Sequence, residues 1–201
     1  MKKFGTAVIL AGGKSSRMGF DKQFMKIKGK RLLKIMVDKL RREFVDIIIV
    51  TNKPEQYEGS SCRIFCDEIK QRGPLSGIHA GLKESISRYA YFTACDMPNI
   101  NIGYIRYMEE KIRNLKVDAC VTRLGDRLEH FNAFYSRNVI DDIEELLSKD
   151  CRSVSSLTRR VNTFYVEEKE ARRYSPGWDM FMNVNTREDL DRYIDSLIKF
   201  T

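Results

Sequence analysis

Short apolar runs alternate along the chain with stretches of helical periodicity. The runs Thr6–Leu10, Phe44–Thr51 and Tyr89–Cys95 are rich in β-branched and aromatic residues, which predicts buried strands. Apolar residues at positions 33, 36, 37 and 40 recur at helical spacing and predict a helix over residues 31–43. The consecutive β-branched residues at 47–50 are typical of a strand covered on both faces, as in a parallel sheet.

The same alternation continues toward the end of the chain. It predicts strands over residues 62–66, 117–122, 130–135 and 163–166, and helices over 76–88, 102–115, 139–147, 154–159 and 187–199. A turn at 124–127 separates two of these strands, and Thr186 with Asp189 forms a capping box for the last helix. This order predicts a three-layer α/β fold with a mainly parallel sheet. No repeat or linker interrupts it, so we expect a single domain over residues 1–201.

Composition and charge limit the class of protein. The chain has 201 residues, 42% of them hydrophobic and 32% charged, which is typical of a globular domain. The net charge of +8 fits nucleic acid, a membrane surface, a small polyanionic substrate or solubility alone. Five cysteines without a C-x-x-C pair favour reduced thiols in a cytoplasmic protein. No apolar run reaches the roughly 18 residues of a membrane span, and no signal-peptide cleavage site is evident, so we expect no membrane partner.

The loop after the first predicted strand carries the densest candidate chemistry. Open parallel sheets bind ligands outside the carboxyl ends of their strands. Residues 11–22 read AGGKSSRMGFDK, with three glycines that let the backbone approach a ligand. Lys14, Arg17 and Lys22 add cations suited to a di- or triphosphate. The spacing matches neither the P-loop nor the dinucleotide fingerprint, and a solvated basic loop stays open as the alternative.

Asp67 and Asp96 each follow a predicted strand at the same edge of the sheet. Asp96 is a candidate ligand of Mg²⁺, which takes one or two protein carboxylates and completes its octahedron with water and phosphate oxygens. A turn-forming or helix-capping role is the alternative for Asp96. Asp67 is a candidate for a second metal position or a ligand hydroxyl, or it caps its loop.

The histidines and two of the cysteines are expected to serve packing. His79 lies among small residues of a predicted helix, and Cys62 and Cys66 are expected to be core residues of one strand. His130 lies in a strand from which it could reach a pocket, but nothing in the sequence pairs it with a Ser or Cys nucleophile.

With these residues assembled, the chain resembles the molybdenum cofactor guanylyltransferase family, nucleotidyltransferases with a Rossmann-like α/β/α fold. The longest motif reads LAGGxxxRMGxDK over residues 10–22. Further matches follow in the family's order: Asp67, GPLSGI at 73–78, CDMP at 95–98 and NVNT at 183–186. The chain departs from the family at residues 129–133, EHFNA, where members often carry a proline in the strand facing the substrate.

The resemblance implies transfer of GMP from Mg²⁺-bound GTP to the terminal phosphate of molybdopterin, with release of pyrophosphate. It implies catalytic roles for Arg17, Lys22 and Asp96, with Asp96 as the metal ligand. The binding residues it implies are Leu10, Ala11, Gly12, Gly13, Lys22, Asp67 and Asp96 for GTP, and Gly73, Gly77, Asn183 and Asn185 for molybdopterin. Joining two phosphates calls for charge neutralisation and in-line positioning, which explains the lack of a nucleophilic side chain.

Two other functions stay open. A cytidylyltransferase acting on the same pterin is the nearest, although its first loop usually departs from Leu-Ala-Gly-Gly. A non-catalytic basic protein that binds nucleotide or nucleic acid would need cations on one stripe with aromatics interleaved, whereas the cations here are dispersed. We therefore expect two small-molecule substrates and no nucleic acid. The resemblance also implies transient contact with other proteins of molybdenum cofactor biosynthesis.

Overall fold

A seven-stranded sheet forms the middle of the molecule. The computed structural model describes residues 2–12, 26–27, 29–57, 59–66 and 73–198. The strands lie in the order β5-β4-β1-β6-β8-β7-β9. Their bounds are β1 Lys2–Leu10, β4 Asp46–Val50, β5 Arg63–Phe65, β6 Ser87–Ala94, β7 Ala119–Leu124, β8 Arg127–Ser136 and β9 Thr163–Val166. Neighbouring strands are parallel except where β8 pairs with β6 and β7, so the mainly parallel sheet is confirmed.

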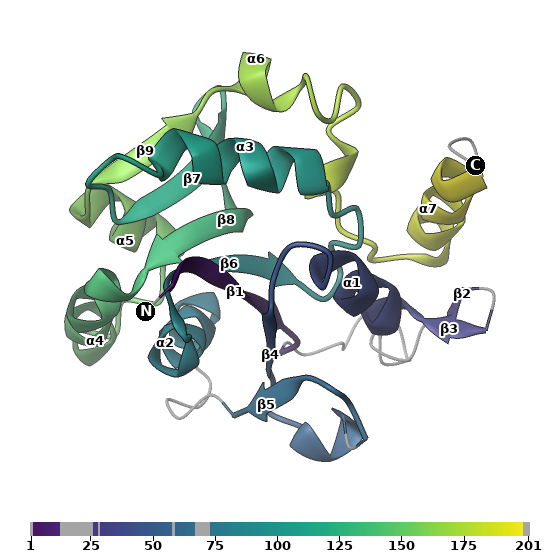
Figure 1. Cartoon of the computed structure of the whole chain (residues 1–201), viewed down its shortest axis with the longest axis horizontal. Helices are drawn as coiled ribbons and strands as arrows, with labels where there is room; N and C mark the ends of the chain where they lie inside the picture. Colours follow the sequence, from purple (N-terminus) through teal and green to yellow (C-terminus); the bar gives the residue numbers. More distant parts are fainter. Residues whose placement is uncertain (1, 13–25, 28, 58, 67–72, 199–201) are drawn as a thin grey trace.

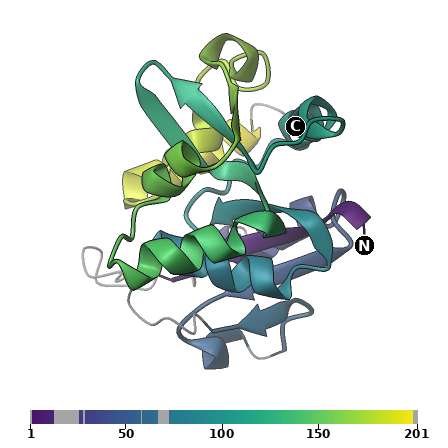
Figure 2. The ribbon, with the colours of Figure 1, turned by 90° about the vertical axis from the view of Figure 1, so that its left-hand side faces the viewer.

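Helices lie on both faces of this sheet (Figures 1 and 2). One face is covered by α1 (Leu32–Leu40), α3 (Ile102–Ile112), α6 (Glu168–Ala171) and the short turn η4 (Asp179–Phe181). The other is covered by α2 (Pro74–Glu84), η3 (Arg137–Val139), α4 (Ile140–Ser148) and α5 (Val154–Arg160). The three-layer α/β/α fold is therefore confirmed. The turn η2 (Pro54–Tyr57) precedes β5, and β2 (Lys26–Ile27) forms a small hairpin with β3 (Lys30–Arg31).

The central strand β1 shows how the apolar runs build the core. Ala7 and Ile9 belong to the cluster with α1 and α3, whereas Val8 and Leu10 belong to the cluster with α2 and α4. Successive side chains of a strand point to opposite faces, so a strand between two helical layers needs apolar residues at consecutive positions. All five residues of β4 are likewise buried, which confirms the prediction of a strand covered on both faces.

The last helix, α7 (Arg187–Ile198), packs apart from the two main layers (Figure 1). Leu32 of α1, Val184 and Tyr193 form its small apolar cluster. At its start, the backbone amides of Asn185 and Thr186 both donate to Asp189 Oδ2 at 2.9 Å. The Asp189 amide donates to Thr186 Oγ1 at 3.1 Å. The predicted capping box is confirmed, and these amide bonds lower the pKa of Asp189.

Strand β8 is irregular over residues 129–133, the segment for which we expect a departure from the family pattern. Between the register pairs Thr122↔Glu129 and Cys120↔Phe134, β7 advances by two residues and β8 by five. Asn132, inside this bulge, has a left-handed backbone with φ +53°. Asparagine tolerates this region better than most residues because its short polar side chain can form local hydrogen bonds. The bulge changes the direction in which the side chains of this part of β8 point.

Some predicted boundaries are wrong. The helix predicted over 76–88 ends at Glu84, because the chain bends into β6 and the Ser87 hydroxyl accepts a hydrogen bond from the Thr6 amide at 3.1 Å. Cys62 and Cys66 flank the three-residue strand β5, and Cys66 is exposed, so they are not a pair of core residues.

Among the described residues, no helix combines the length and apolar character needed to cross a bilayer.

Candidate active site

The backbone that leads into the glycine-rich loop is held from both sides. Leu10 ends β1 and pairs with Val50 of β4 on one side and with Ala94 of β6 on the other. The Ala11 amide then donates to the Val50 carbonyl at 2.8 Å, and the Cys95 amide donates to the Leu10 carbonyl at 3.0 Å. Three parallel strands therefore end together at this edge, and the predicted nucleotide residues Leu10 and Ala11 lie at its centre.

Gly12 and Asn52 lie next to each other at this edge. Gly12 is exposed, and a Cβ built on it would lie 3.9 Å from Asn52 Nδ2. Asn52 follows β4 by two residues and is not among the predicted site residues. Its position in the sequence could have indicated a role, because a polar residue shortly after a buried parallel strand lies at the ligand-binding edge, as Asp96 does.

Asp96 lies in the turn after β6 and is half-buried. The Met97 amide closes this turn by donating to the Ala94 carbonyl at 3.0 Å. The carbonyl of Asp96 itself accepts the Val184 amide at 2.7 Å. The predicted metal ligand is thereby tied to the segment that carries the predicted pterin residues Asn183 and Asn185, both of which are exposed.

The two predicted pterin glycines of α2 differ in their surroundings. Gly73 precedes the helix with φ +76°, and a Cβ built on it would lie 3.8 Å from the Cβ of Arg152. Arg152, a cation just before α5, was missed because only the fold brings it beside Gly73. Gly77 is buried against Leu10, whose two methyl groups would both lie 3.2 Å from an added Cβ. Gly77 therefore allows close packing between α2 and the end of β1.

Four of the predicted site residues lie outside the described part of the chain: Gly13, Arg17, Lys22 and Asp67.

The residues at this edge fit a metal that is held mainly by a ligand. No group of three or more His, Cys, Asp or Glu side chains suited to a metal ion occurs among the described residues. Asp96 supplies one carboxylate, and Mg²⁺ usually takes only one or two from a protein and fills its other positions with water and phosphate oxygens. A nucleotide-borne divalent metal therefore suits this edge better than a metal enclosed by protein ligands.

The two histidines have side-chain partners. His79 is 3% exposed and its Nε2 lies 2.8 Å from Glu144 Oε1, which confirms a packing role. His130 Nε2 lies 2.8 Å from Ser155 Oγ, a hydrogen-bond partner that the sequence did not indicate. Its other ring nitrogen is buried without a hydrogen-bond partner, and burial together with the charge of Arg159 lowers its pKa. An imidazole that no carboxylate orients is not the base of a catalytic triad.

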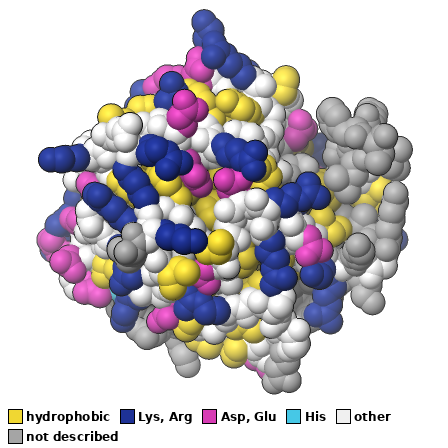
Figure 3. Space-filling model, viewed as in Figure 1, with side chains coloured by type: hydrophobic (Ala, Val, Ile, Leu, Met, Phe, Trp, Pro, Cys, Tyr) yellow, Lys and Arg dark blue, Asp and Glu magenta, His cyan; other side chains and the backbone are white. Residues whose placement is uncertain are grey.

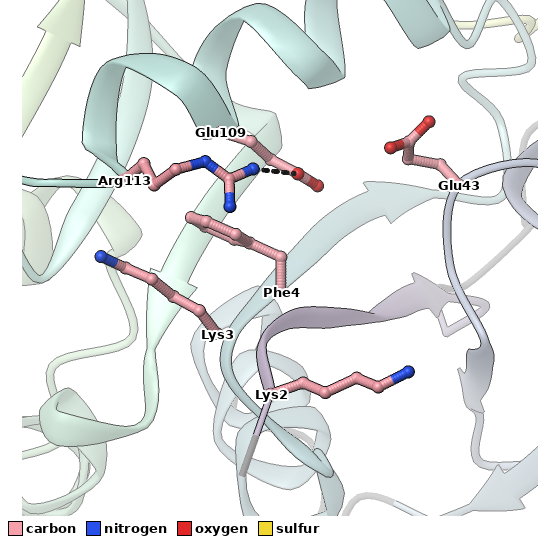
Figure 4. A pocket seen from close by; sticks show the side chains of 6 residues that line it. All are labelled: Lys2, Lys3, Phe4, Glu43, Glu109 and Arg113. Carbon is pink, nitrogen blue, oxygen red and sulfur yellow. Dashed lines mark ion pairs between the residues drawn. The ribbon is translucent and has the colours of Figure 1, made fainter.

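A hollow of about 330 Å³ lies at the opposite, amino-terminal end of β1 (Figure 4). Its lining residues are Lys2, Lys3, Phe4, Glu43, Glu109 and Arg113. Glu109 is 7% exposed, and Arg113 Nη2 reaches its Oε2 at 3.7 Å. Burial, aided by the charge of Glu43, raises the pKa of Glu109 to about 7. The hollow is separate from the candidate site, because β1 runs away from it toward Leu10.

The surface charge seen in Figure 3 is dispersed. Lys and Arg side chains are spread over this face, with acidic and apolar groups between them. In this view acidic side chains interrupt the cations, so the cations form no continuous basic stripe of the kind that nucleic-acid-binding proteins present. Among the described residues, Arg160 pairs with Asp142 at 2.7 Å and with Glu145.

Comparison with known proteins identifies one family model, several curated relatives and several solved structures similar to this chain. The model of the MobA-like NTP transferase domain matches residues 7–164. The molybdenum cofactor guanylyltransferase of Syntrophotalea carbinolica is 50% identical over 191 residues, which cover 95% of this chain and 91% of that protein. The probable molybdenum cofactor guanylyltransferase of Peptoclostridium acidaminophilum is 49% identical over 197 residues, covering 96% and 89%. The crystal structure of molybdopterin-guanine dinucleotide biosynthesis protein A from Archaeoglobus fulgidus shares the fold, with a TM-score of 0.83, 24% identity and coverage of 96% and 99%.

Proposed function

Because the chain belongs to the family of MobA-like NTP transferase domains and is a nucleotidyltransferase, we propose that it transfers GMP from GTP to the terminal phosphate of molybdopterin. The observation that carries this proposal is the convergence of Gly12, Asn52 and Asp96 at the carboxyl edge of three parallel strands. The named activity of the two relatives that share half of the sequence supports the choice of substrates. We also propose that residues 1–201 act as one domain, since helices from both halves of the chain cover one sheet.

The nucleotide would bind over the start of the glycine-rich loop. Leu10, Ala11 and Gly12 offer backbone groups that the flanking strands hold in place, and these would read the guanine. Gly13, Arg17, Lys22 and Asp67 complete this proposal, with Arg17 and Lys22 neutralising the phosphates. Asn52 adds an amide beside Gly12 that can hydrogen-bond the nucleotide.

In the reaction, an oxygen of the acceptor phosphate bonds to the α-phosphorus of GTP. The bond from that phosphorus to the bridging oxygen breaks, and pyrophosphate leaves with the electron pair. Two anions must approach each other, so positioned cations account for most of the rate enhancement. Asp96 would hold Mg²⁺, which supplies positive charge to the triphosphate when bound. No side-chain nucleophile is needed, which agrees with the unoriented imidazole of His130.

The acceptor would bind between the start of α2 and the segment before α7. Asn183 and Asn185 flank Val184, whose amide binds the Asp96 carbonyl, so both lie close to the proposed metal ligand. Gly73 provides backbone on the other side. The Cβ of Arg152 lies beside Gly73, and its guanidinium, which pairs with Asp150 at 3.0 Å, would supply a cation for the acceptor phosphate. Gly77, which the resemblance assigns to the acceptor, packs on Leu10 of the nucleotide side, so it would connect the two sides of the site.

Pyrophosphate release with molybdopterin, Mg²⁺ and each of GTP, CTP and ATP tests the proposal. We expect turnover with GTP, loss of turnover on chelation and recovery on adding Mg²⁺. A preference for CTP would instead identify a cytidylyltransferase, and no release with any nucleotide would refute the transferase.

Two variants test the residues, with a third as control. Asp96→Ala should abolish transfer and leave the fold intact, and Lys22→Ala should slow transfer by orders of magnitude. Asp141→Ala removes an exposed carboxylate from the first turn of α4 and should keep full activity. Full activity of Asp96→Ala would contradict the metal assignment, and unchanged turnover of Lys22→Ala would remove that residue from the site.

A further inference from the structure

Three asparagine side chains hold the segment that carries the proposed acceptor residues. We call residues 174–186 the acceptor-side segment. Asn101 Nδ2 donates to the Tyr174 carbonyl at 2.7 Å, and Asn99 Nδ2 donates to the Asp179 carbonyl at 3.2 Å. Asn132 Nδ2 donates to the Met180 carbonyl. Each carboxamide thus fixes a backbone carbonyl of a segment that has little regular structure of its own.

Asn132 differs from the other two because it is buried, and its carboxamide, like that of Asn101, is bonded at both ends. It is 2% exposed, and its Oδ1 accepts the hydroxyl of Tyr91 at 2.8 Å. Tyr91 is itself buried, and burial raises its pKa well above the ordinary value, so its hydroxyl keeps the proton that it donates. A buried carboxamide with both ends satisfied specifies one arrangement of the elements it joins.

The elements that Asn132 joins are the two sides of the proposed site. Tyr91 belongs to β6, the strand that leads to Asp96. Met180 lies four residues before Val184, whose amide binds the Asp96 carbonyl at 2.7 Å. The carboxamide of Asn132 and this backbone bond therefore fix the acceptor-side segment to the Asp96 strand at two points.

We propose that Asn132 is a positioning residue that sets the acceptor-side segment against the Asp96 strand and so determines capture of the phosphate acceptor. The bulge in β8 serves this role, because the left-handed backbone at Asn132 places its carboxamide between β6 and η4. The inference rests on the proposed function for the identity of the acceptor. The tether itself is a property of the fold and can be tested without substrates.

Steady-state kinetics with two variants separates the carboxamide from the backbone. Asn132→Gly keeps the left-handed conformation accessible and removes both hydrogen bonds. Asn132→Asp keeps the side-chain shape and loses the donor to Met180. Misplacement of a substrate-binding segment by about 1 Å costs about 100-fold, so we expect both variants to raise KM for molybdopterin about 10- to 100-fold. KM for GTP should change less than about twofold, and Asn138→Ala, which removes an exposed carboxamide outside the acceptor-side segment, should change neither constant by more than about twofold.

The single tryptophan of the chain reports on the same segment without activity. Trp178 lies two residues before Met180, and its ring contacts that of Phe181 in a tilted arrangement, with centroids 4.7 Å apart. Asn132→Gly should shift its emission to the red and increase quenching by acrylamide, with unchanged far-ultraviolet circular dichroism. Asn138→Ala, outside the segment, should leave the emission nearly unchanged.

The outcomes distinguish this inference from the proposed function. Unchanged Trp178 emission in both Asn132 variants overturns the tether. Shifted emission with an unchanged ratio of the two KM values overturns the positioning role. Equal loss of GTP and molybdopterin binding also overturns it, since that indicates general loosening. If the wild-type protein transfers no GMP to molybdopterin, the proposed function fails, whereas the emission measurement still decides whether Asn132 holds the segment.

Discussion

The Glu109→Gln variant tests how much the buried carboxyl of Glu109, in the hollow at the amino end of β1, changes the stability of the fold. Glu109 lies on α3, and Figure 4 shows Arg113 reaching its carboxylate, with Glu43 on the other side of the hollow. Burial and the charge of Glu43 raise its pKa from 4.5 to about 7. The folded protein therefore keeps a proton that the unfolded chain releases between pH 4.5 and 7. The stabilisation from this carboxyl is full below pH 4.5 and is lost as the pH rises through 7.

The pKa difference gives the size of the effect. A rise from 4.5 to about 7 corresponds to about 3 kcal/mol between the protonated and ionised forms. Glu109→Gln is neutral at every pH, so it should be more stable than the wild type by up to about 3 kcal/mol at pH 8.5. The advantage should shrink below about 1 kcal/mol at pH 5, where the wild-type carboxyl is protonated in the folded state.

Urea unfolding followed by circular dichroism between pH 5 and 9 measures this difference. Glu110→Gln is the matched control, because Glu110 is an exposed neighbour on the same helix. Its free energy of unfolding relative to the wild type should not vary with pH. A difference for Glu109→Gln that is also flat across this range, or a wild type that is more stable at pH 8.5, would refute the reasoning.

Three further substitutions test packing and the buried histidine. Gly81→Ala places a Cβ 2.8 Å from two buried core side chains, so it should destabilise the fold by about 1–3 kcal/mol in thermal unfolding and leave GTP affinity unchanged. The Cβ of Gly77→Ala would lie 3.2 Å from the methyl groups of Leu10, so this variant should lose less stability than Gly81→Ala and should weaken GTP binding in calorimetry. The opposite ranking of the two variants in stability and in GTP affinity would contradict this. Burial lowers the pKa of His130, so the folded state resists protonation and loses stability as the pH falls below about 6.5. His130→Gln should therefore lose less stability than the wild type between pH 7 and 5 in urea unfolding, and an equal loss would refute the assignment.

Burial on both faces made most of the sheet predictable from sequence. The apolar runs at β1, β4 and β6 were recognisable because both helical layers require apolar side chains there. The strand over 163–166 was predicted with the bounds that the structure has. The edge strand β5 was predicted too long. It has only three residues and Cys66 after it is exposed, so the apolar pattern does not show where the strand ends.

A site residue could be predicted from the sequence only where the end of a single strand determines its place. Asp96 follows a buried strand, so its place at the ligand-binding edge could be inferred from the strand alone. Arg152 and Asn132 lie beside residues that are distant in the chain. For Asn132, the direction of β8 decides which residues these are. The short turn at 124–127 is compatible only with antiparallel neighbours, so the direction of β8 relative to β7 could be inferred, whereas its pairing with β6 and its bulge could not be derived from the pattern.

The position of β1 also has a consequence for how the chain folds during synthesis. Although β1 is made first, it is central, and its residue Thr6 pairs with Asp46 on one side and Ala90 on the other. Both pairings are non-local, and the second cannot form until some 90 residues have left the ribosome. Until then the apolar run ending at Leu10 has no partner on that side, and such a strand is prone to aggregate or to recruit a chaperone. The edge that assembles the proposed site is thus completed late, when β6 arrives and brings Asp96 beside the end of β1.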